Sequence, residues 1–200
     1  PVGTAPEVPA RRPVLAEVPE GATADRAPHE VTTAVHFDHL LVDDDGVTWD
    51  CSHDSGMEFQ LGTTTVRCTA TGAEGGSEEH RFPVHVRYPF EFRDELADGE
   101  TRVAAGRSLE IAFHLHGDRG GNPFATPPES RPLDCASGEA LGEREPVRAR
   151  GRRLLDYHRR SKEYRCDWKT DRAWRGQCRE LVLEMVDGSV HTALITFRPR

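Results

Sequence analysis

Short runs of alternating apolar and polar residues, separated by turn residues, set the strongest limit on how this chain can fold. β-branched residues that recur with a period of two are strand signals. Such runs stand at residues 31–37, 63–69, 82–87, 108–116, 163–168, 180–186 and 190–197. Asp187-Gly188 lies between the last two runs and predicts a tight hairpin. The pattern allows short helical turns only at 152–162 and 169–177. Because strands do not alternate with helices, the sequence predicts an all-β protein built of antiparallel β-sandwiches.

Three segments differ in composition. Residues 1–12 contain three prolines and no aromatic residue, which predicts an extended arm of polyproline or β character. A second change falls near residues 87–92, where Tyr88-Pro-Phe-Glu-Phe92 predicts a packed connection rather than a flexible linker. The chain of 200 residues is long enough for two domains with cores of their own. We therefore expect an arm at 1–12, one domain at 13–87 and a second at 88–200.

The overall charge argues against one class of function. The chain has 34 acidic residues against 26 Lys and Arg, a formal net charge of −8. A dedicated nucleic-acid binder needs a positive surface to displace counterions, so that class is disfavoured. No apolar stretch approaches the roughly 20 residues that span a bilayer. The first residues also lack the regions of a signal peptide, so we expect the sequence to be the mature form of a secreted protein.

The charge is unevenly distributed along the chain. Residues 148–179 hold twelve Arg or Lys and four Asp or Glu, whereas residues 1–147 hold twelve basic and 27 acidic residues. Such polarity favours oriented docking on a partner with a complementary field. A solvated surface with chance clustering is the alternative. The residues expected to form a partner-binding basic patch are Arg152, Arg153, Arg159, Arg160, Arg172 and Arg175.

Histidines and acidic residues offer two candidate metal sites. His114 and His116 share one face of the expected strand at 108–116, and Asp118 continues that face. The alternative is an exposed polar face, since no third ligand follows from the spacing. Asp43-Asp44-Asp45-Gly46 could bind calcium or form an acidic turn. His36, Asp38 and His39 are discounted in the same way, and we expect no metal and no cofactor.

Enzyme signatures are missing from the sequence. There is no Gly-x-Ser-x-Gly elbow, no phosphate-binding Gly-Lys-Thr loop and no zincin motif. We therefore expect a protein that is not an enzyme. A metal-dependent hydrolase centred on His114 and His116 is the third hypothesis, after the two binding hypotheses given below.

The first half of the chain carries a recognisable motif. The run Ser55-Gly-Met-Glu-Phe-Gln-Leu-Gly-Thr-Thr-Thr-Val-Arg-Cys-Thr-Ala-Thr71 resembles the signature of HYR (hyalin repeat) domains, and the resemblance extends over residues 12–87. It implies an immunoglobulin-like fold associated with adhesion. Where the family carries Asp and then Gly-Asn, this chain has Gly72, Gly75 and Gly76, so no role of those polar residues transfers.

The second half resembles the PxKF domain of secreted actinobacterial proteins, over residues 88–199. The matching stretches are Val103–Gly106, Leu109–Asp118, Pro132–Cys135, Leu154–Tyr157, Tyr164–Trp174, Gly176–Arg179 and Asp187–Ala193. The motif that names the family reads Glu110-Ile-Ala-Phe113 here, so only its phenylalanine is present. Neither resemblance implies catalysis.

Five cysteines without a C-x-x-C pair predict a disulfide framework in an oxidising compartment, with unrelated buried thiols as the alternative. The two resemblances imply the pairs Cys51–Cys68 and Cys135–Cys178. Cys166 is then the odd thiol. We expect it to be buried and inert, because Tyr164 and Trp168 share its strand face. A disulfide between two chains is the alternative.

These observations predict a secreted, non-enzymatic adaptor that bridges partner proteins in a hetero-oligomeric extracellular complex. The arm residues expected to enter a partner are Pro1, Val2, Pro6, Val8 and Pro9. Large bacterial toxin particles with bridging subunits are one such setting, by analogy of fold alone. The alternative is a cell-surface or glycan-binding adhesion module, with sugars stacked on Tyr164, Trp168 and Trp174. A role in the core is the other interpretation of these rings.

Overall fold

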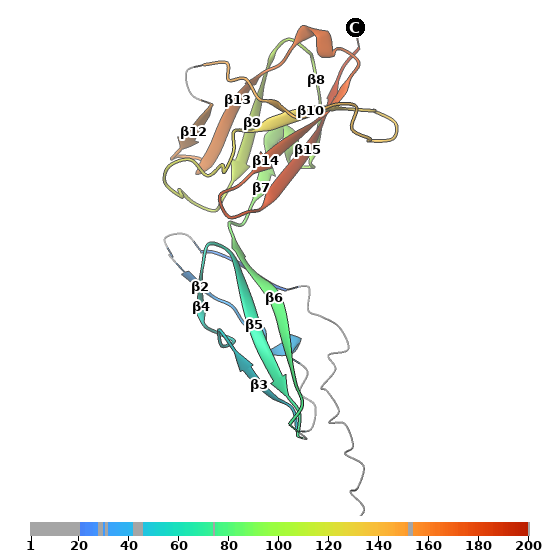
Figure 1. Ribbon diagram of the computed structural model, residues 1–200. Helices are drawn as coiled ribbons and strands as arrows, with labels where there is room; N and C mark the ends of the chain where they lie inside the picture. The colour runs from blue at the N-terminus through green and yellow to red at the C-terminus, as the bar shows by residue number, and fades with distance from the viewer. Residues whose placement is uncertain are drawn as a thin grey trace, which may run out of the picture. The chain divides into compact units, whose positions relative to one another are not determined.

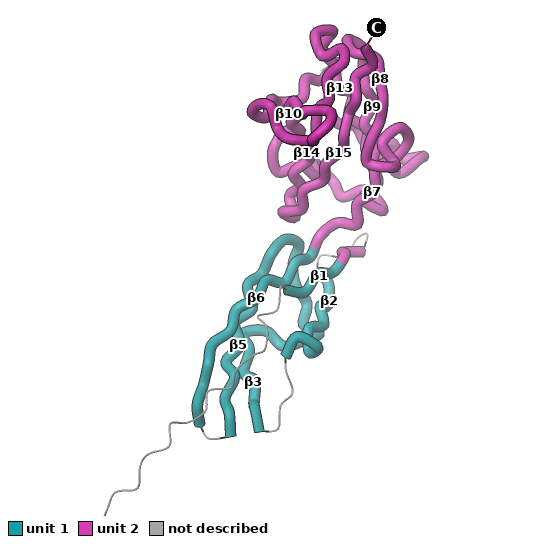
Figure 2. Tube along the Cα trace, turned by 90° about the vertical axis from the view of Figure 1, so that its right-hand side faces the viewer, with its two compact units in different colours: residues 1–24, 31–86 teal, residues 25–30, 87–200 magenta. Residues whose placement is uncertain are grey.

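The structure, a computed structural model, describes a chain that is almost entirely β-structure. It covers residues 21–27, 30, 32–41, 46–73, 75–151 and 154–199. The arm at 1–12 and Asp43–Asp45 lie outside the described residues. The described residues group into two compact units, drawn from residues 1–24 and 31–86 and from residues 25–30 and 87–200 (Figure 2). The predicted all-β sandwich fold is confirmed.

The first unit consists of a four-stranded sheet and a two-stranded sheet (Figure 1). The larger sheet has the order β1-β6-β5-β3, and β2 pairs with β4 in the smaller one. The strands are β1 (Ala22–Asp25), β2 (Thr32–Ala34), β3 (Thr48–Cys51), β4 (Glu58–Gln60), β5 (Gly62–Thr71) and β6 (Ser77–Arg87). The long β5–β6 hairpin contains two of the runs predicted from the sequence.

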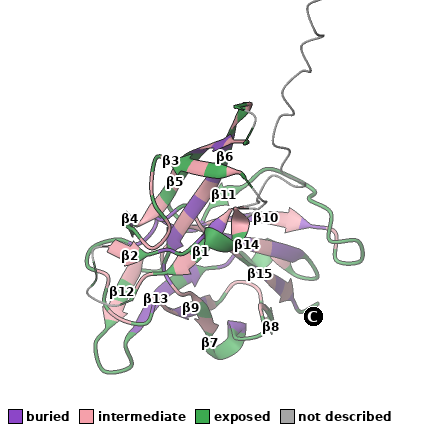
Figure 3. Cartoon of the chain, turned by 90° about the horizontal axis from the view of Figure 1, so that it is seen from below, coloured by how far each residue is buried: buried purple, intermediate pink, exposed green. Residues whose placement is uncertain are grey.

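Alternating side chains of β5 and β6 build the core of the first unit. Val66 and Cys68 on β5 are buried, as are Phe82 and Val84 on β6, whereas residues between them are more exposed (Figure 3). Phe37 packs edge-on against Phe82, with ring centroids 5.2 Å apart. The period of two in the sequence therefore marks the buried face of this sheet.

The second unit consists of a five-stranded sheet and a four-stranded sheet. Their orders are β11-β10-β14-β15-β8 and β12-β13-β9-β7. The strands are β7 (Glu91–Arg93), β8 (Glu100–Val103), β9 (Ser108–His114), β10 (Glu129–Leu133), β11 (Glu145–Pro146), β12 (Leu155–His158), β13 (Glu163–Lys169), β14 (Cys178–Glu184) and β15 (Val190–Phe197). The pairs β9–β13 and β14–β15 are antiparallel as predicted, whereas β8 runs parallel to β15. No short hairpin joins β8 to β15, so the connection does not impose an antiparallel pair.

Large aromatic and aliphatic side chains from both sheets fill the second unit. Phe113 and Tyr164 stack with ring centroids 5.4 Å apart on neighbouring strands. The other sheet contributes fully buried Leu181, Leu183 and Phe197. The β14–β15 hairpin closes as predicted at Asp187-Gly188, where the Asp187 carboxylate accepts a 2.9 Å hydrogen bond from the Ser189 amide.

Residues 25–30 belong to the second unit, although the sequence interpretation placed them within the domain 13–87. The Arg119 guanidinium lies over the Tyr88 ring, with its Cζ atom 4.9 Å from the centroid. It also donates hydrogen bonds to the carbonyl oxygens of Ala27 (3.0 Å) and Arg26 (3.2 Å). Burial, and secondly the neighbouring Arg26, lower the pKa of Arg119. These contacts join residues far apart in the sequence, so the local pattern could not predict them.

Helical structure is limited to the short 3-10 turns η1 (Asp38–Leu40), η2 (Asp94–Leu96) and η3 (Arg172–Trp174) in the described part of the chain. The turn η3 falls within 169–177 as predicted. The other predicted site of helical turns, 152–162, instead contains β12, because Leu155–His158 pair with β13. Within the described ranges, no helix is long and apolar enough to cross a membrane.

Each unit contains one disulfide. Cys51 and Cys68 are direct register partners on β3 and β5, with Cα atoms 4.0 Å apart. Cys135, which follows β10, is bonded to Cys178 at the start of β14, with Cα atoms 5.2 Å apart. Both pairs are those implied by the family resemblances. Cys166 is a free, buried thiol, as predicted.

Removing the bridge of the second unit should weaken that unit. The double variant Cys135→Ala/Cys178→Ala opens a loop with a sequence separation of 43. We expect the free energy of unfolding to fall by about 2–4 kcal/mol, because the unfolded chain regains loop entropy. Urea unfolding followed by tryptophan fluorescence measures this. The matched variant Cys51→Ala/Cys68→Ala, which opens a separation of 17, should lose less. Equal stability of the first variant and the parent chain would contradict this account.

The remaining thiol should be unreactive in the folded chain. Burial raises the pKa of Cys166 to about 12, so the thiolate that attacks electrophiles is scarce at pH 8. We expect iodoacetamide to label no thiol of the native protein and one thiol per chain in urea, counted by mass spectrometry. Rapid labelling without denaturant, or a chain-to-chain disulfide on a non-reducing gel, would contradict the buried position.

Candidate binding pocket in the second unit

A pocket of about 870 Å³ opens at the end of the second unit where β9 begins and β13 ends. Ser130 on β10 and Glu145 on β11 line it. Trp168 and Lys169 at the end of β13 and Trp174 in the turn η3 line it as well. Its volume lies in the range of small-molecule sites. The pocket therefore lies where strands of both sheets end.

The turn between β8 and β9 supports the pocket wall. Gly106 has a φ of +79°, and a Cβ atom there would collide with Cγ of Arg172. The Gly106 amide donates a 3.0 Å hydrogen bond to the Thr170 hydroxyl, which itself donates to the carbonyl of Arg107 at 2.6 Å. Glycine is required because the backbone is left-handed and Arg172 packs directly on it. The turn thereby holds the segment 170–172 at the pocket.

A buried arginine lies behind the pocket wall. The Arg179 side chain is only 3% exposed, and its Cζ atom lies 4.2 Å from the Trp174 ring centroid. Its Nε donates to the Ser130 hydroxyl, and its Nη2 donates to the Ser130 carbonyl and the Glu145 carboxylate, each at 3.3 Å. Burial lowers the pKa of Arg179, while Glu145 raises it. The ion pair therefore joins an interior cation to a carboxylate that is 64% exposed.

The rim of the pocket carries charges of both signs. Arg148, Lys169 and Arg172 line it and are exposed, and Glu145 and Asp171 line it as well. All three rim cations come from the basic segment 148–179. The Asp171 carboxylate also accepts a 2.9 Å hydrogen bond from the Ala173 amide, which starts the turn η3. The uneven charge of the sequence thus contributes a set of cations to one pocket.

The four residues of the predicted basic patch that the structure describes fall into two pairs. Arg159 and Arg160 lie in the turn before β13, whereas Arg172 and Arg175 follow its end. A strand of seven residues spans about 20 Å. The two pairs are therefore held apart at opposite ends of β13, and Arg152 and Arg153 lie outside the described residues. The charge distribution of the sequence identified the basic segment 148–179. It did not show that strand β13 separates the two ends of this segment.

His114 and His116 do not converge on a common metal position. His114 Nε2 lies 3.4 Å from a Glu163 carboxylate oxygen, whereas His116 Nε2 lies 3.5 Å from Glu91. The two imidazole rings are 6.5 Å apart. Two hydrogen bonds hold the pKa of the Glu163 carboxyl below its usual range. The one from Arg165 has the larger effect, and the one from Ser161 the smaller. This face of the β7-β9-β13 sheet is a network of ion pairs.

Asp118, the third member of that candidate group, has other contacts. Its carboxylate accepts hydrogen bonds from the Gly120 amide (3.0 Å) and the Tyr164 hydroxyl (3.4 Å). Within the ranges that the structure describes, no group of three or more His, Cys, Asp or Glu side chains is arranged to hold a metal ion.

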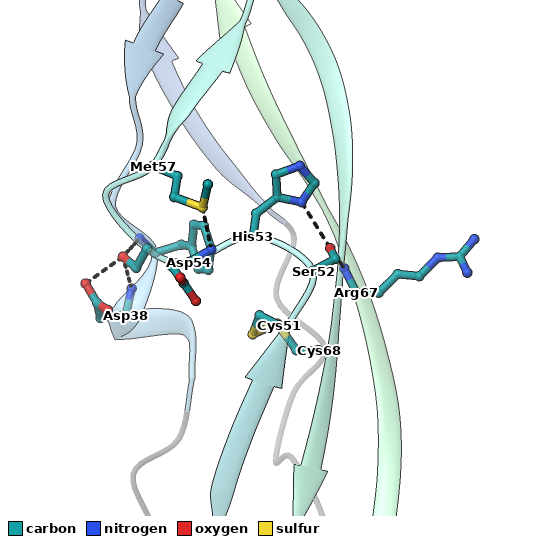
Figure 4. The surroundings of a disulfide bond; sticks show 10 residues. Asp38, Cys51, Ser52, His53, Asp54, Met57, Arg67 and Cys68 are labelled. Atoms are coloured by element: carbon teal, nitrogen blue, oxygen red, sulfur yellow. Dashed lines mark hydrogen bonds between the residues drawn. A yellow bond between two sulfur atoms is a disulfide. The ribbon is translucent and has the colours of Figure 1, made fainter.

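The polar residues around the Cys51–Cys68 disulfide have structural contacts (Figure 4). Ser55 Oγ donates to the Asp38 carboxylate at 2.6 Å and accepts from the Asp38 amide at 3.1 Å. Asp38 thus holds η1 to the loop before β4. His36 and His39, which were discounted together with Asp38, are exposed.

The three rings considered for sugar stacking are mostly inside. Tyr164 and Trp168 are each 1% exposed, and only Trp174 is partly exposed. The core interpretation therefore holds for Tyr164 and Trp168. The sequence did not predict that Arg179, Ser130 and Glu145 would meet behind Trp174. The only indication of this cluster in the sequence was that Arg179 belongs to the basic segment 148–179.

Comparisons with known proteins give weak matches. No protein-family model and no curated protein matches the sequence. One similar solved structure is SGBP-B of the Bacteroides ovatus mixed-linkage glucan utilization locus in complex with a heptasaccharide (14% identity, 98% of this chain and 48% of that chain, TM-score 0.26). Others are the fibronectin(III)-like modules of Clostridium thermocellum CbhA (15%, 73% and 66%, 0.23) and the insect immune protein hemolin (14%, 90% and 52%, 0.26). This chain spans about half the length of the first. Identities and TM-scores this low support no inference about function.

Substitution of Gly106 should destabilise the protein more than substitution of a glycine in an open turn. Gly106→Ala places a Cβ atom against Arg172 in a left-handed backbone, so we expect a loss of more than about 1 kcal/mol in unfolding free energy. Gly138→Ala is the control, because its φ is +73° and nothing lies within 4 Å of the added atom. Urea unfolding compares the two variants. Equal losses would show that the contact with Arg172 contributes nothing.

Proposed function

We propose that this protein is a non-enzymatic, extracellular binding module that bridges partner proteins in a larger assembly. The observation that carries the proposal is the pair of compact units, each with its own core and its own disulfide. Units built in this way keep their binding surfaces without each other's support, so one chain can hold two partners. Disulfides stabilise small domains in oxidising compartments, which agrees with a place outside the cell.

The proposed ancestry of the two units is HYR-like for the first and PxKF-like for the second. Their all-β architecture and the two disulfides at the motif cysteines support this assignment. The proline-rich residues 1–12 are the proposed insertion element for one partner, since an extended chain offers its backbone to a sheet edge or groove. A toxin particle is one assembly in which such a bridge would act.

The glycan-binding alternative has weaker support from the geometry. Burial of Tyr164 and Trp168 removes two of the three rings that would stack on sugars. The metal-dependent hydrolase has less support still, because His114 and His116 have separate carboxylate partners. The bridging function is therefore the one we carry forward.

Partner capture tests the bridging function. The full chain, residues 1–200, and a chain lacking residues 1–12 are each tagged and used to purify partners from the culture supernatant of the source organism. Mass spectrometry should identify at least two partners with the full chain and the loss of one with the truncated chain. Matching thermal unfolding of the two chains is the control for folding. Capture of the same partners by both chains would refute the role of the arm, and capture of none by either would refute the bridging function.

A further inference from the structure

We infer that the pocket of the second unit binds an acidic peptide segment of a protein partner, with a ligand carboxylate taking the place of Glu145 on Arg179. This inference deepens the proposed bridging function and rests on it. Binding of an acidic segment requires cations around a cavity, so that the segment makes several contacts at once.

Arg179 provides the fixed end of the interaction. Its side chain is buried, and its three hydrogen bonds use Nε and Nη2. The guanidinium carries two further N–H groups on Nη1. An interior arginine held in one orientation by Ser130 and Trp174 loses little freedom when a carboxylate binds.

Glu145 provides the exchangeable end. Its side chain is 64% exposed, and it lies on β11, a strand of two residues at the edge of its sheet. Its carboxylate is open to solvent, and its only hydrogen bond within the described part of the chain is a single 3.3 Å contact with Arg179 Nη2. An incoming carboxylate can therefore replace it at Arg179, while the buried cation keeps an anionic partner throughout.

The rim distinguishes an acidic peptide from an acidic polysaccharide. Arg148 and Lys169 attract acidic side chains, whereas Glu145 and Asp171 repel a uniform polyanion and accept hydrogen bonds from peptide N–H groups. A sugar would also need a free aromatic face. Around the Trp174 ring, the Arg179 guanidinium lies at 4.2 Å and the Trp168 and Phe197 rings at 5.6 and 5.5 Å, so its surface is largely occupied. The charges and the crowded ring both favour a peptide.

Fluorescence polarisation with a short fluorescein-labelled peptide of alternating Glu and Ser tests the inference, with the matching Gln–Ser peptide as the ligand control. The full chain should bind the acidic peptide and not the neutral one, and added salt should weaken binding. Arg148→Gln/Lys169→Gln should lower the affinity about ten-fold. The matched control Arg159→Gln/Arg160→Gln removes the same charge at the other end of β13 and should change it less than about two-fold.

A second substitution should act in the opposite direction. Glu145→Gln removes the competing carboxylate, so the acidic peptide should bind roughly two- to five-fold more tightly. Glu139→Gln, the same charge change at an exposed residue that does not line the pocket, should have little effect. Thermal unfolding of each variant checks that the fold is kept.

Three results would overturn the inference. One is equal binding of the acidic and neutral peptides, and another is equal loss in the pocket and control variants. The third is preferential binding of oligogalacturonate, which would assign the pocket to a saccharide. These failures are distinct from failure of the bridging function, which is measured by partner capture. A chain that captures partners equally well with and without Arg148→Gln/Lys169→Gln bridges them through another surface.

Discussion

The pairing of β9 with β13 is the contact on which the second unit depends. In this register Phe113 lies beside Tyr164, Ile111 beside Cys166 and Leu109 beside Trp168. All six side chains are buried. A slip of one residue would turn one of these rows to the opposite face of the sheet, so the burial of large side chains specifies the register strongly. The same pairing ends β13 at Lys169 and directs the following residues to the pocket.

Trp174 lies between aromatic rings and a buried cation beside the pocket. The Trp168 and Phe197 rings pack against it at 5.6 and 5.5 Å, and the Arg179 guanidinium lies 4.2 Å from its ring centroid. A buried charge costs free energy unless it is paired and hydrogen-bonded, and here Ser130, Glu145 and an aromatic ring share that task. Apolar residues of similar volume are often as stabilising at such a position. An arginine there agrees with the binding role proposed for this pocket.

The two units illustrate different ways to stabilise a small sandwich. In the first, β3 and β5 are linked directly by Cys51–Cys68, close to a core centred on Phe37 and Phe82. In the second, a bridge ties the end of β10 to the start of β14, while the β9–β13 rows fill the interior. Each unit thus has a core and a covalent staple of its own. That independence is what the proposed bridging function requires.

The sequence by itself determined the β-class, the main strands and the buried rows, because a period of two and β-branched residues act locally. It also indicated that Cys166 is buried among aromatic neighbours. Tertiary structure decided the parallel β8–β15 pair, the attachment of Arg26 and Ala27 through Arg119, and β12 in place of helical turns. It also separated Arg159 from Arg172 and brought Ser130, Glu145 and Arg179 together. Contacts between distant strands have no local signature, so a site built from strand ends emerges only once the sheets are packed.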